Sequence, residues 1–221
     1  MTLETTRWTV LDAVLALLAG VVAAAVALGF LGADPTNSEI FLVVLPAQEL
    51  ATLGAVWLIS RRKGTGDLVA DFGIRFVRRD WVWLVSGVAM QVALSWIVVW
   101  LTDIDEAPQE IARLTDEATG AAAVAAFLST VLLVPVVEEL VFRGLLLRAV
   151  ERKLGAWWGI GISAAVFAMF HYTGSETVPI LPALFVVGAV LGLAAVRTGR
   201  LGASMVIHAG FNLLPAIILI F

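Results

Sequence analysis

Long apolar segments separated by short polar connections limit most strongly what this chain can fold into. Crossing a bilayer as a helix takes about 20 apolar residues, and seven segments approach that length: 8–31, 40–60, 81–101, 121–153, 156–172, 178–196 and 201–220. The chain is 61% hydrophobic and 14% charged, whereas a soluble domain is about half apolar and about a quarter charged. We therefore predict an all-α, polytopic transmembrane helical bundle of about seven spans, with residues 1–221 forming a single domain.

The connections between these segments carry most of the polar residues. Residues 32–38 have the composition of a turn. The mixed segment 67–80 is typical of a short interfacial element lying on the bilayer, and 103–119 is an acidic loop. The fourth apolar segment is long for one span, so it must tilt, protrude or bend near Pro135. Because Glu4 rather than a basic region precedes the first apolar segment, we expect a retained span and not a cleaved signal.

Lysine and arginine residues predict the orientation. If the seven spans alternate in direction, one side receives nearly all basic residues outside the spans: Arg7, Arg61, Arg62, Lys63, Arg75, Arg78, Arg79, Arg148, Arg152, Lys153, Arg197 and Arg200. Arg113 falls on the other side. Because cytoplasmic loops are enriched in Lys and Arg, we expect an integral membrane protein with a cytoplasmic N-terminus and an external C-terminus. The Ala- and Val-rich composition favours a bacterial cell membrane.

Composition also excludes several classes of function. The chain has no Cys, so it has neither a disulfide framework nor a thiolate nucleophile or metal ligand. It has no basic patch of the kind that binds nucleic acid, so we expect no nucleic-acid partner.

Glu138, Glu139 and Arg143 interrupt the apolar fourth segment. Ionisable groups at membrane depth are costly, and by default they suggest a functional site. Residues four apart share a helix face, whereas neighbours point about 100° apart. Glu139 can therefore pair with Arg143 while Glu138 faces elsewhere and stays available. A structural ion pair would explain Glu139 and Arg143 alone, but the second carboxylate favours general acid or base chemistry.

The only two histidines of the chain lie in or near other apolar segments. His171 follows Phe167 by four residues in the fifth segment, and Asn212 follows His208 by four in the seventh. Taken singly, each polar residue could instead be an interfacial hydrogen-bonding group or a link between helices.

Depth along the helices links the first of these histidines to Glu138. Glu138 lies 16 residues before Leu154, and His171 lies 16 residues after Gly155, at the turn between the fourth and fifth segments. Both are therefore about 24 Å from that turn, and antiparallel packing would bring them level. His208 matches this depth only if the fourth and fifth helices tilt or begin below the membrane.

These motifs together resemble those of the CPBP intramembrane proteases, which include the type II CAAX prenyl endopeptidases and the bacterial Abi proteins. The motifs are Glu138-Glu139-x-x-x-Arg143, Phe167-x-x-x-His171 and His208-x-x-x-Asn212, and the resemblance covers about residues 121–214. It implies an endopeptidase that hydrolyses a peptide bond of a membrane-associated or lipid-modified peptide. Glu138 and His171 would activate water, and His208 and Asn212 would stabilise the oxyanion. Glu139, Arg143 and Phe167 would support the site.

The resemblance also bears on cofactors and partners. The family is commonly labelled metalloprotease, and Glu138, His171 and His208 could bind Zn²⁺ as in other two-His-one-Glu sites. Yet no H-E-x-x-H presents two ligands from one helix, so we favour a metal-free mechanism and leave zinc open. The expected partners are membrane lipids and a peptide or protein substrate. The alternatives are a non-enzymatic scaffold or immunity factor that uses the polar cluster structurally, and proton-coupled transport through Glu138.

Overall fold

The computed structural model describes residues 7–32, 36–102 and 120–220, and every regular element in these ranges is helical. The first half contains α1 (Val10–Leu31), α2 (Asn37–Glu39), η2 (Ile40–Val44), α3 (Leu45–Lys63), α4 (Leu68–Phe72), η3 (Arg78–Asp80) and α5 (Trp81–Thr102). The second half contains α7 (Ala121–Leu128), η4 (Ser129–Leu133), α8 (Val134–Glu138), η5 (Glu139–Leu147), α9 (Arg148–Leu154), α10 (Ala156–Phe170), η6 (Ser175–Ile180), α11 (Leu181–Thr198) and α12 (Leu201–Ile220). The predicted all-α bundle is confirmed, and the predicted acidic loop at 103–119 lies outside the described residues.

Five helical stretches in the described residues are long and apolar enough to cross a membrane: Val10–Leu31, Ile40–Lys63, Arg78–Leu101, Ala121–Leu154 and Ser175–Thr198. Two shorter apolar helices, Ala156–Phe170 and Leu201–Ile217, occupy the positions of the predicted fifth and seventh spans. Trp81 and Trp100, near the two ends of α5, are strongly exposed, as expected for side chains that meet the interfaces of a bilayer.

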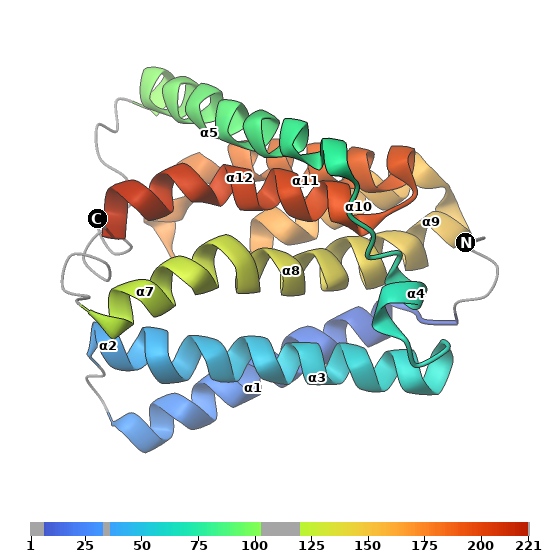
Figure 1. Cartoon of the computed structure of the whole chain (residues 1–221), viewed down its shortest axis with the longest axis horizontal. Coiled ribbons are helices and arrows are strands. Elements are labelled where there is room, and N and C mark those ends of the chain that lie inside the picture. Colours follow the sequence, from blue (N-terminus) through green and yellow to red (C-terminus); the bar gives the residue numbers. More distant parts are fainter. Residues whose placement is uncertain (1–6, 33–35, 103–119, 221) are drawn as a thin grey trace.

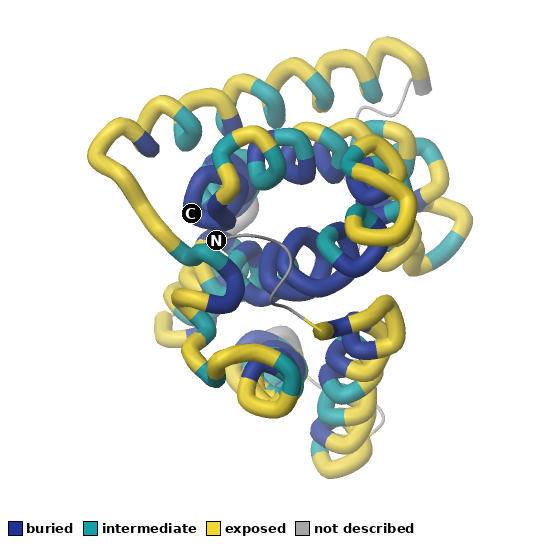
Figure 2. The backbone as a smooth tube through the Cα atoms, turned by 90° about the vertical axis from the view of Figure 1, so that its right-hand side faces the viewer, coloured by how far each residue is buried: buried dark blue, intermediate teal, exposed yellow. Residues whose placement is uncertain are grey.

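The continuous helix from α7 to α9 runs through the middle of the molecule (Figure 1). The α1–α3 pair packs on one side of it, and α10, α11 and α12 lie on the other. Helix α5 packs along α12 at the outside of the bundle, with most of its surface exposed (Figure 2). The main hydrophobic core gathers around η5, so the segment that carries Glu139 and Arg143 is the most deeply buried part of the fold.

The central helix is not a regular α-helix near Pro135. Residues Ser129–Leu133 form a π-helical turn, in which the Val134 N–H donates to the carbonyl of Ser129, five residues back. A second π-helical stretch, η5, begins at Glu139. π-helical turns are rare in proteins, and those that occur often lie at functional sites. The irregularity predicted near Pro135 therefore takes the form of a wider helical turn just before the acidic motif.

Two glycines make the tight connections that set the order of helices in the second half. Gly155 has φ +91° between α9 and α10, and Gly199 has φ +65° between α11 and α12. Side chains other than glycine rarely adopt these conformations. The first of these turns makes α10 run back along the central helix, which brings the end of α10 to the level of Glu138.

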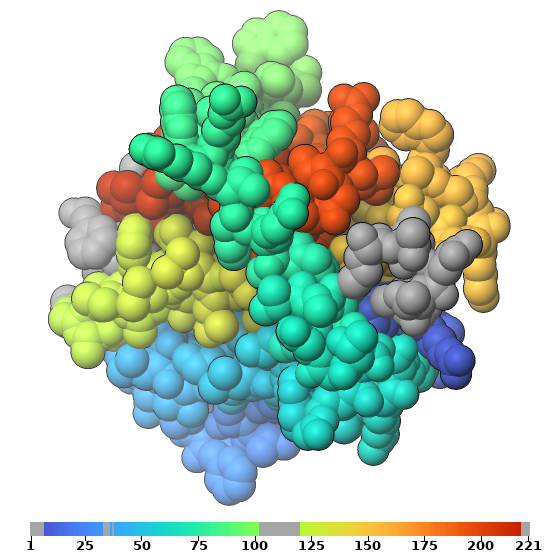
Figure 3. Space-filling model, turned by 45° about the vertical axis from the view of Figure 1, so that its right-hand side comes forward, coloured from blue at the N-terminus to red at the C-terminus, as the bar shows by residue number. Residues whose placement is uncertain are grey.

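The segment 67–80 differs in part from the predicted interfacial element. Phe76 and Val77 are exposed, but Phe72 is fully buried and stacks on Trp8 with ring centroids 4.9 Å apart. Arg148 donates to the carbonyl groups of both Asp71 and Phe72 at 2.9 Å. The segment crosses the surface of the bundle from the end of α3 toward α12 (Figure 3). It is therefore fastened to the protein rather than simply resting on a bilayer.

Ion pairs and backbone contacts hold the predicted basic side together at one end of the bundle. Lys63 Nζ lies 2.6 Å from Asp12 Oδ1, and Arg200 makes two hydrogen bonds to Asp80, at 2.7 and 2.6 Å. Arg152 contacts the carbonyl oxygen of Trp8. The basic residues of α3, α9 and the α11–α12 turn thus share one end, and the C-terminus lies at the other (Figure 1).

Candidate active site

Glu139 and Arg143 form a buried ion pair at the centre of the bundle. Arg143 Nη1 lies 2.8 Å from Glu139 Oε1, and neither side chain is exposed. Arg143 Nη2 also donates to the carbonyl of Gly188 in α11 at 3.0 Å. The pairing predicted from the spacing of these residues is therefore confirmed, and it also connects η5 to α11.

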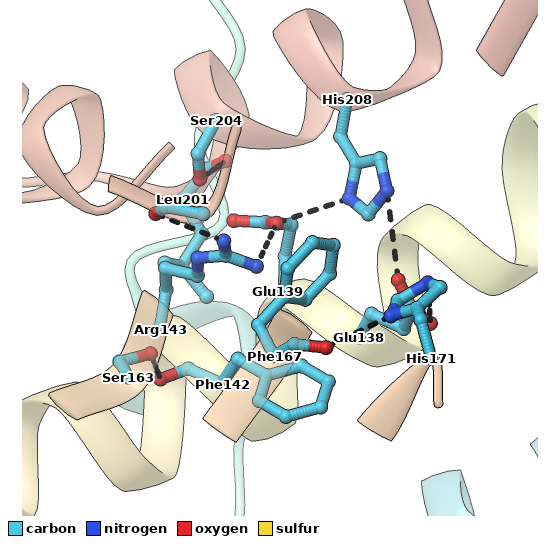
Figure 4. A network of polar contacts seen from close by, with 11 residues as sticks. Glu138, Glu139, Phe142, Arg143, Ser163, Phe167, His171, Leu201, Ser204 and His208 are labelled. Atoms are coloured by element: carbon cyan, nitrogen blue, oxygen red, sulfur yellow. Dashed lines mark hydrogen bonds and ion pairs between the residues drawn. The ribbon is translucent and has the colours of Figure 1, made fainter. Parts of the chain in front are cut away.

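Glu138 points away from this pair and toward the two histidines (Figure 4). Its Oε1 lies 3.9 Å from His171 Nε2, and its Oε2 lies 3.5 Å from His208 Nε2. The predicted alignment of Glu138 with His171 is thus confirmed, and His208 joins them at the same depth. One water molecule can be reached by the carboxylate and both imidazoles.

Hydrogen bonds behind each imidazole ring determine which nitrogen faces Glu138. His171 Nδ1 lies 2.8 Å from the carbonyl oxygen of Phe167. Because a carbonyl only accepts, Nδ1 carries the proton, and Nε2 of the neutral ring is an acceptor. His208 Nδ1 lies 3.1 Å from Glu139 Oε1. Glu139 therefore orients His208 with the same oxygen that holds Arg143.

Phe167 packs against Arg143 of the ion pair and against both histidines. The guanidinium carbon of Arg143 lies 4.6 Å from the centroid of its ring. The rings of His171 and His208 lie 4.7 and 5.7 Å from the same centroid. The Phe167 side chain thus contacts all three charged or titratable groups, while its backbone carbonyl fixes His171.

Asn212 lies one turn beyond His208 on α12, and its Nδ2 donates to the carbonyl of Thr130 at 2.9 Å. The π-helical turn explains why that carbonyl is available. In a π-helix the carbonyl of residue i accepts a hydrogen bond from the N–H of residue i+5. The partner of the Thr130 carbonyl would be Pro135, and proline has no N–H. Asn212 satisfies this backbone oxygen and keeps a second N–H on its amide group.

Sequence reasoning missed the polar residues that α3 contributes. Glu138 borders a cavity of about 20 Å³, which is also lined by Gln48, Glu49 and Thr52 of α3 and by apolar side chains of α1, η5 and α10. Glu49 is 5% exposed and lies in an apolar span. The signal was present, because the rule that drew attention to Glu138 applies equally to a lone carboxylate at position 49.

The donor atoms do not form a preorganised metal site. Among the described residues, no group of three or more His, Asp or Glu side chains could hold a metal ion. The hydrogen bond behind each imidazole ring involves Nδ1 and leaves Nε2 facing Glu138, so Glu138, His171 and His208 would be the ligands if a metal were bound. Because their present arrangement is not that of a metal site, we derive no reaction step through a metal.

Comparison with known proteins gives one match. Residues 120–214 match the family model Rce1-like, described as type II CAAX prenyl endopeptidase Rce1-like. No curated protein and no solved structure matches the chain. The match covers the central helix, both histidines and the amide of Asn212, and it agrees with the resemblance predicted from the motifs. Residues 120–214 of this integral membrane protein are thus similar to the Rce1-like family of type II CAAX prenyl endopeptidases.

Proposed function

We propose that this protein is an intramembrane endopeptidase that hydrolyses a peptide bond of a membrane-associated or lipid-modified peptide. The observation that carries the proposal is the convergence of His171 Nε2 and His208 Nε2 on the Glu138 carboxylate, at 3.9 and 3.5 Å. Glu139 does not compete for this role because Arg143 already neutralises it. The family match of the surrounding segment supports the same reaction.

In the proposed mechanism, Glu138 accepts a proton from a water molecule that His171 Nε2 helps to orient. The water oxygen attacks the carbonyl carbon of the scissile peptide bond. The resulting oxyanion receives hydrogen bonds from His208 Nε2, in its doubly protonated form, and from the second N–H of Asn212. Glu139, at Nδ1, holds the His208 ring so that Nε2 is directed toward the oxyanion. The C–N bond then breaks, and the proton held by Glu138 passes to the leaving amine nitrogen.

Supporting roles follow from the contacts of the remaining motif residues. Glu139 and Arg143 would fix His208, and Phe167 would fix the ring of His171 through its backbone carbonyl. Replacing Glu138 should therefore abolish peptide hydrolysis and leave the fold intact. Replacing a supporting residue should lower both the rate of hydrolysis and the stability of the fold.

The proposal is tested by product identification with purified protein in lipid vesicles. The probes are a farnesylated peptide ending in a CAAX sequence and the same peptide without the lipid, and the readout is the mass of the products. We expect the wild-type protein to cleave at least one of the two, and Glu138→Gln and His171→Ala to cleave neither while inserting and folding normally. Full activity in both variants would instead favour a structural role of the polar cluster.

The same assay with a chelator tests whether the reaction needs a metal. We expect cleavage to persist after treatment with a strong zinc chelator, because no metal takes part in the proposed steps. Loss of cleavage with chelator and recovery with added Zn²⁺ would contradict the metal-free mechanism.

The orientation is a separate proposal. We propose that the end of the bundle that holds Lys63, Arg148 and Arg200 faces the cytoplasm of a bacterial cell, as the positive-inside rule requires. Cysteines introduced singly at exposed positions test it, because the native chain has none. In intact cells, Lys153→Cys at this end, on the exposed surface of α9, should resist a membrane-impermeant thiol reagent until the membrane is permeabilised. Immediate labelling would contradict the orientation.

A further inference from the structure

We propose that Glu49 is a positioning residue of the active site, which holds Glu138 in place through a water molecule in the cavity between them. The inference rests on the proposed function of Glu138. It adds a residue from α3, which lies outside the matched segment 120–214.

The first support is the shape and chemistry of the cavity. Its volume of about 20 Å³ exceeds the roughly 10–15 Å³ that one water molecule needs. Four polar side chains line it: Gln48, Glu49, Thr52 and Glu138. A buried water requires two to four polar partners, so this cavity is suited to holding one.

The second support is that polar atoms on both sides need such a partner. Glu138 Oε2 is buried and makes no direct hydrogen bond, and its contact to His208 is longer than one at 3.5 Å. On the opposite wall, Glu49 is buried and receives only the 3.2 Å hydrogen bond from its neighbour Gln48. The two carboxyl groups are close enough to interact electrostatically.

The third support is that the packing of α1 against α3 is adapted to this arrangement. A methyl group on Gly20 of α1 would overlap the hydroxyl of Thr52, which itself donates to the carbonyl of Gln48 at 2.9 Å. The absence of a side chain at position 20 thus lets the polar face of α3 pack closely against α1. Burying the Glu49 carboxylate in an apolar span lowers the stability of the fold. A role of Glu49 in the active site would explain why this costly residue is present.

The consequence is that Glu49 acts on the reaction through Glu138 and does not touch the substrate. Losing it should misplace the Glu138 carboxylate relative to the attacking water. Misplacement of about 1 Å can lower a catalytic rate about 100-fold. The affinity for substrate should stay unchanged.

The test compares Glu49→Met, which keeps the length of the side chain, with Glu49→Gln, which keeps its hydrogen-bonding capacity. Both are assayed in vesicles with an internally quenched farnesylated CAAX peptide. We expect Glu49→Met to lower kcat about 10-fold to 100-fold with KM unchanged, and Glu49→Gln to stay within about threefold of wild type. Glu39→Gln is the matched control, because Glu39 accepts hydrogen bonds from Thr36 and lies outside the cavity.

Three results would overturn the inference. They are wild-type kcat in Glu49→Met, an equal loss in both Glu49 variants, and a raised KM at unchanged kcat. Glu138→Gln serves as the reference: if it retains activity, the proposed function fails, whereas an inactive Glu138→Gln beside a normal Glu49→Met sinks only the role of Glu49.

An infrared measurement tests the inference without turnover. The carboxyl band of Glu138 is obtained as the difference between spectra with and without Glu138→Gln, once in the wild-type background and once with Glu49→Gln. We expect the Glu138 band to shift when Glu49 is replaced. Identical bands in the two backgrounds would contradict any coupling between the two side chains.

Discussion

Replacing Arg143 by Met should leave a buried carboxylate without a counter-ion. Arg143 and Glu139 have no exposed surface, and their charged atoms lie 2.8 Å apart. Breaking such a pair costs about 3–5 kcal/mol, because one charge stays buried and uncompensated. The Gly188 carbonyl also loses its partner, at about 1–3 kcal/mol. The two costs overlap, so we expect Arg143→Met to lower the free energy of unfolding by about 4 kcal/mol, a large part of the 5–15 kcal/mol typical of proteins.

The double variant Glu139→Gln with Arg143→Met separates charge from packing. It removes both charges, so only the contacts to Gly188 and His208 are lost, and we expect a cost of about 1–2 kcal/mol. The double variant should therefore be about 2–3 kcal/mol more stable than Arg143→Met alone.

The assay is equilibrium unfolding in detergent micelles, followed by loss of helical circular dichroism. The wild type, both single variants and the double variant are measured in the same micelles. A cost below about 1 kcal/mol for Arg143→Met, or a double variant less stable than either single one, would refute the reasoning.

Three further predictions concern other parts of the fold. Gly87→Ala should weaken the packing of α5 on α12 by about 1–3 kcal/mol, because the added methyl group would overlap the Ile207 carbonyl. Gly54→Ala is the control in thermal unfolding: nothing lies within 4 Å of a methyl group there, so it should be as stable as wild type or up to about 1 kcal/mol more stable. Burial disfavours the charge of Asp71, but hydrogen bonds from Ser60 and the Thr65–Gly66 backbone outweigh it and hold its pKa below the ordinary value. The stability that Asp71 contributes should be present above a pH of about 4 and lost as the pH falls through the lowered pKa. Melting curves of Asp71→Asn and wild type should therefore differ at pH 7 and converge in acid, and a constant difference would contradict this. Asn212→Ala should lower kcat about 100-fold to 1000-fold with little change in KM, measured with the same fluorogenic peptide. A loss confined to KM would argue against a role at the oxyanion.

Spacing along the chain predicted two contacts of the candidate site. The i,i+4 spacing of Glu139 and Arg143 was enough to predict their ion pair, and equal distance from Gly155 was enough to align Glu138 with His171. The first inference needed no knowledge of the packing, and the second needed only that two consecutive helices pack antiparallel.

Contacts between distant segments could not be predicted in the same way. The single oxygen of Glu139 that serves both Arg143 and His208 depends on how α12 crosses η5. The segment 67–80 was predicted to lie on the bilayer, but its Phe72 packs in the core against Trp8, and Arg148 donates to the Phe72 carbonyl. A pattern of apolar residues predicts that their side chains avoid water, but it does not tell whether they contact lipid or other parts of the protein.

The π-helical turn shows a different limit. Pro135 predicted an irregular helix, but not that the freed carbonyl of Thr130 would be satisfied by Asn212. That pairing joins residues 82 positions apart. It also explains how the predicted oxyanion residue can serve the structure and still have an N–H left for chemistry.

The central claim is that Glu138 activates a water molecule rather than attacking the peptide itself. A single turnover in H₂¹⁸O, with enzyme in excess over peptide, tests it most directly. We predict that the new carboxyl terminus of the product carries ¹⁸O and that the peptide containing Glu138 stays unlabelled. An unlabelled product together with ¹⁸O in Glu138 would contradict the account, because it would mean that Glu138 forms a covalent intermediate.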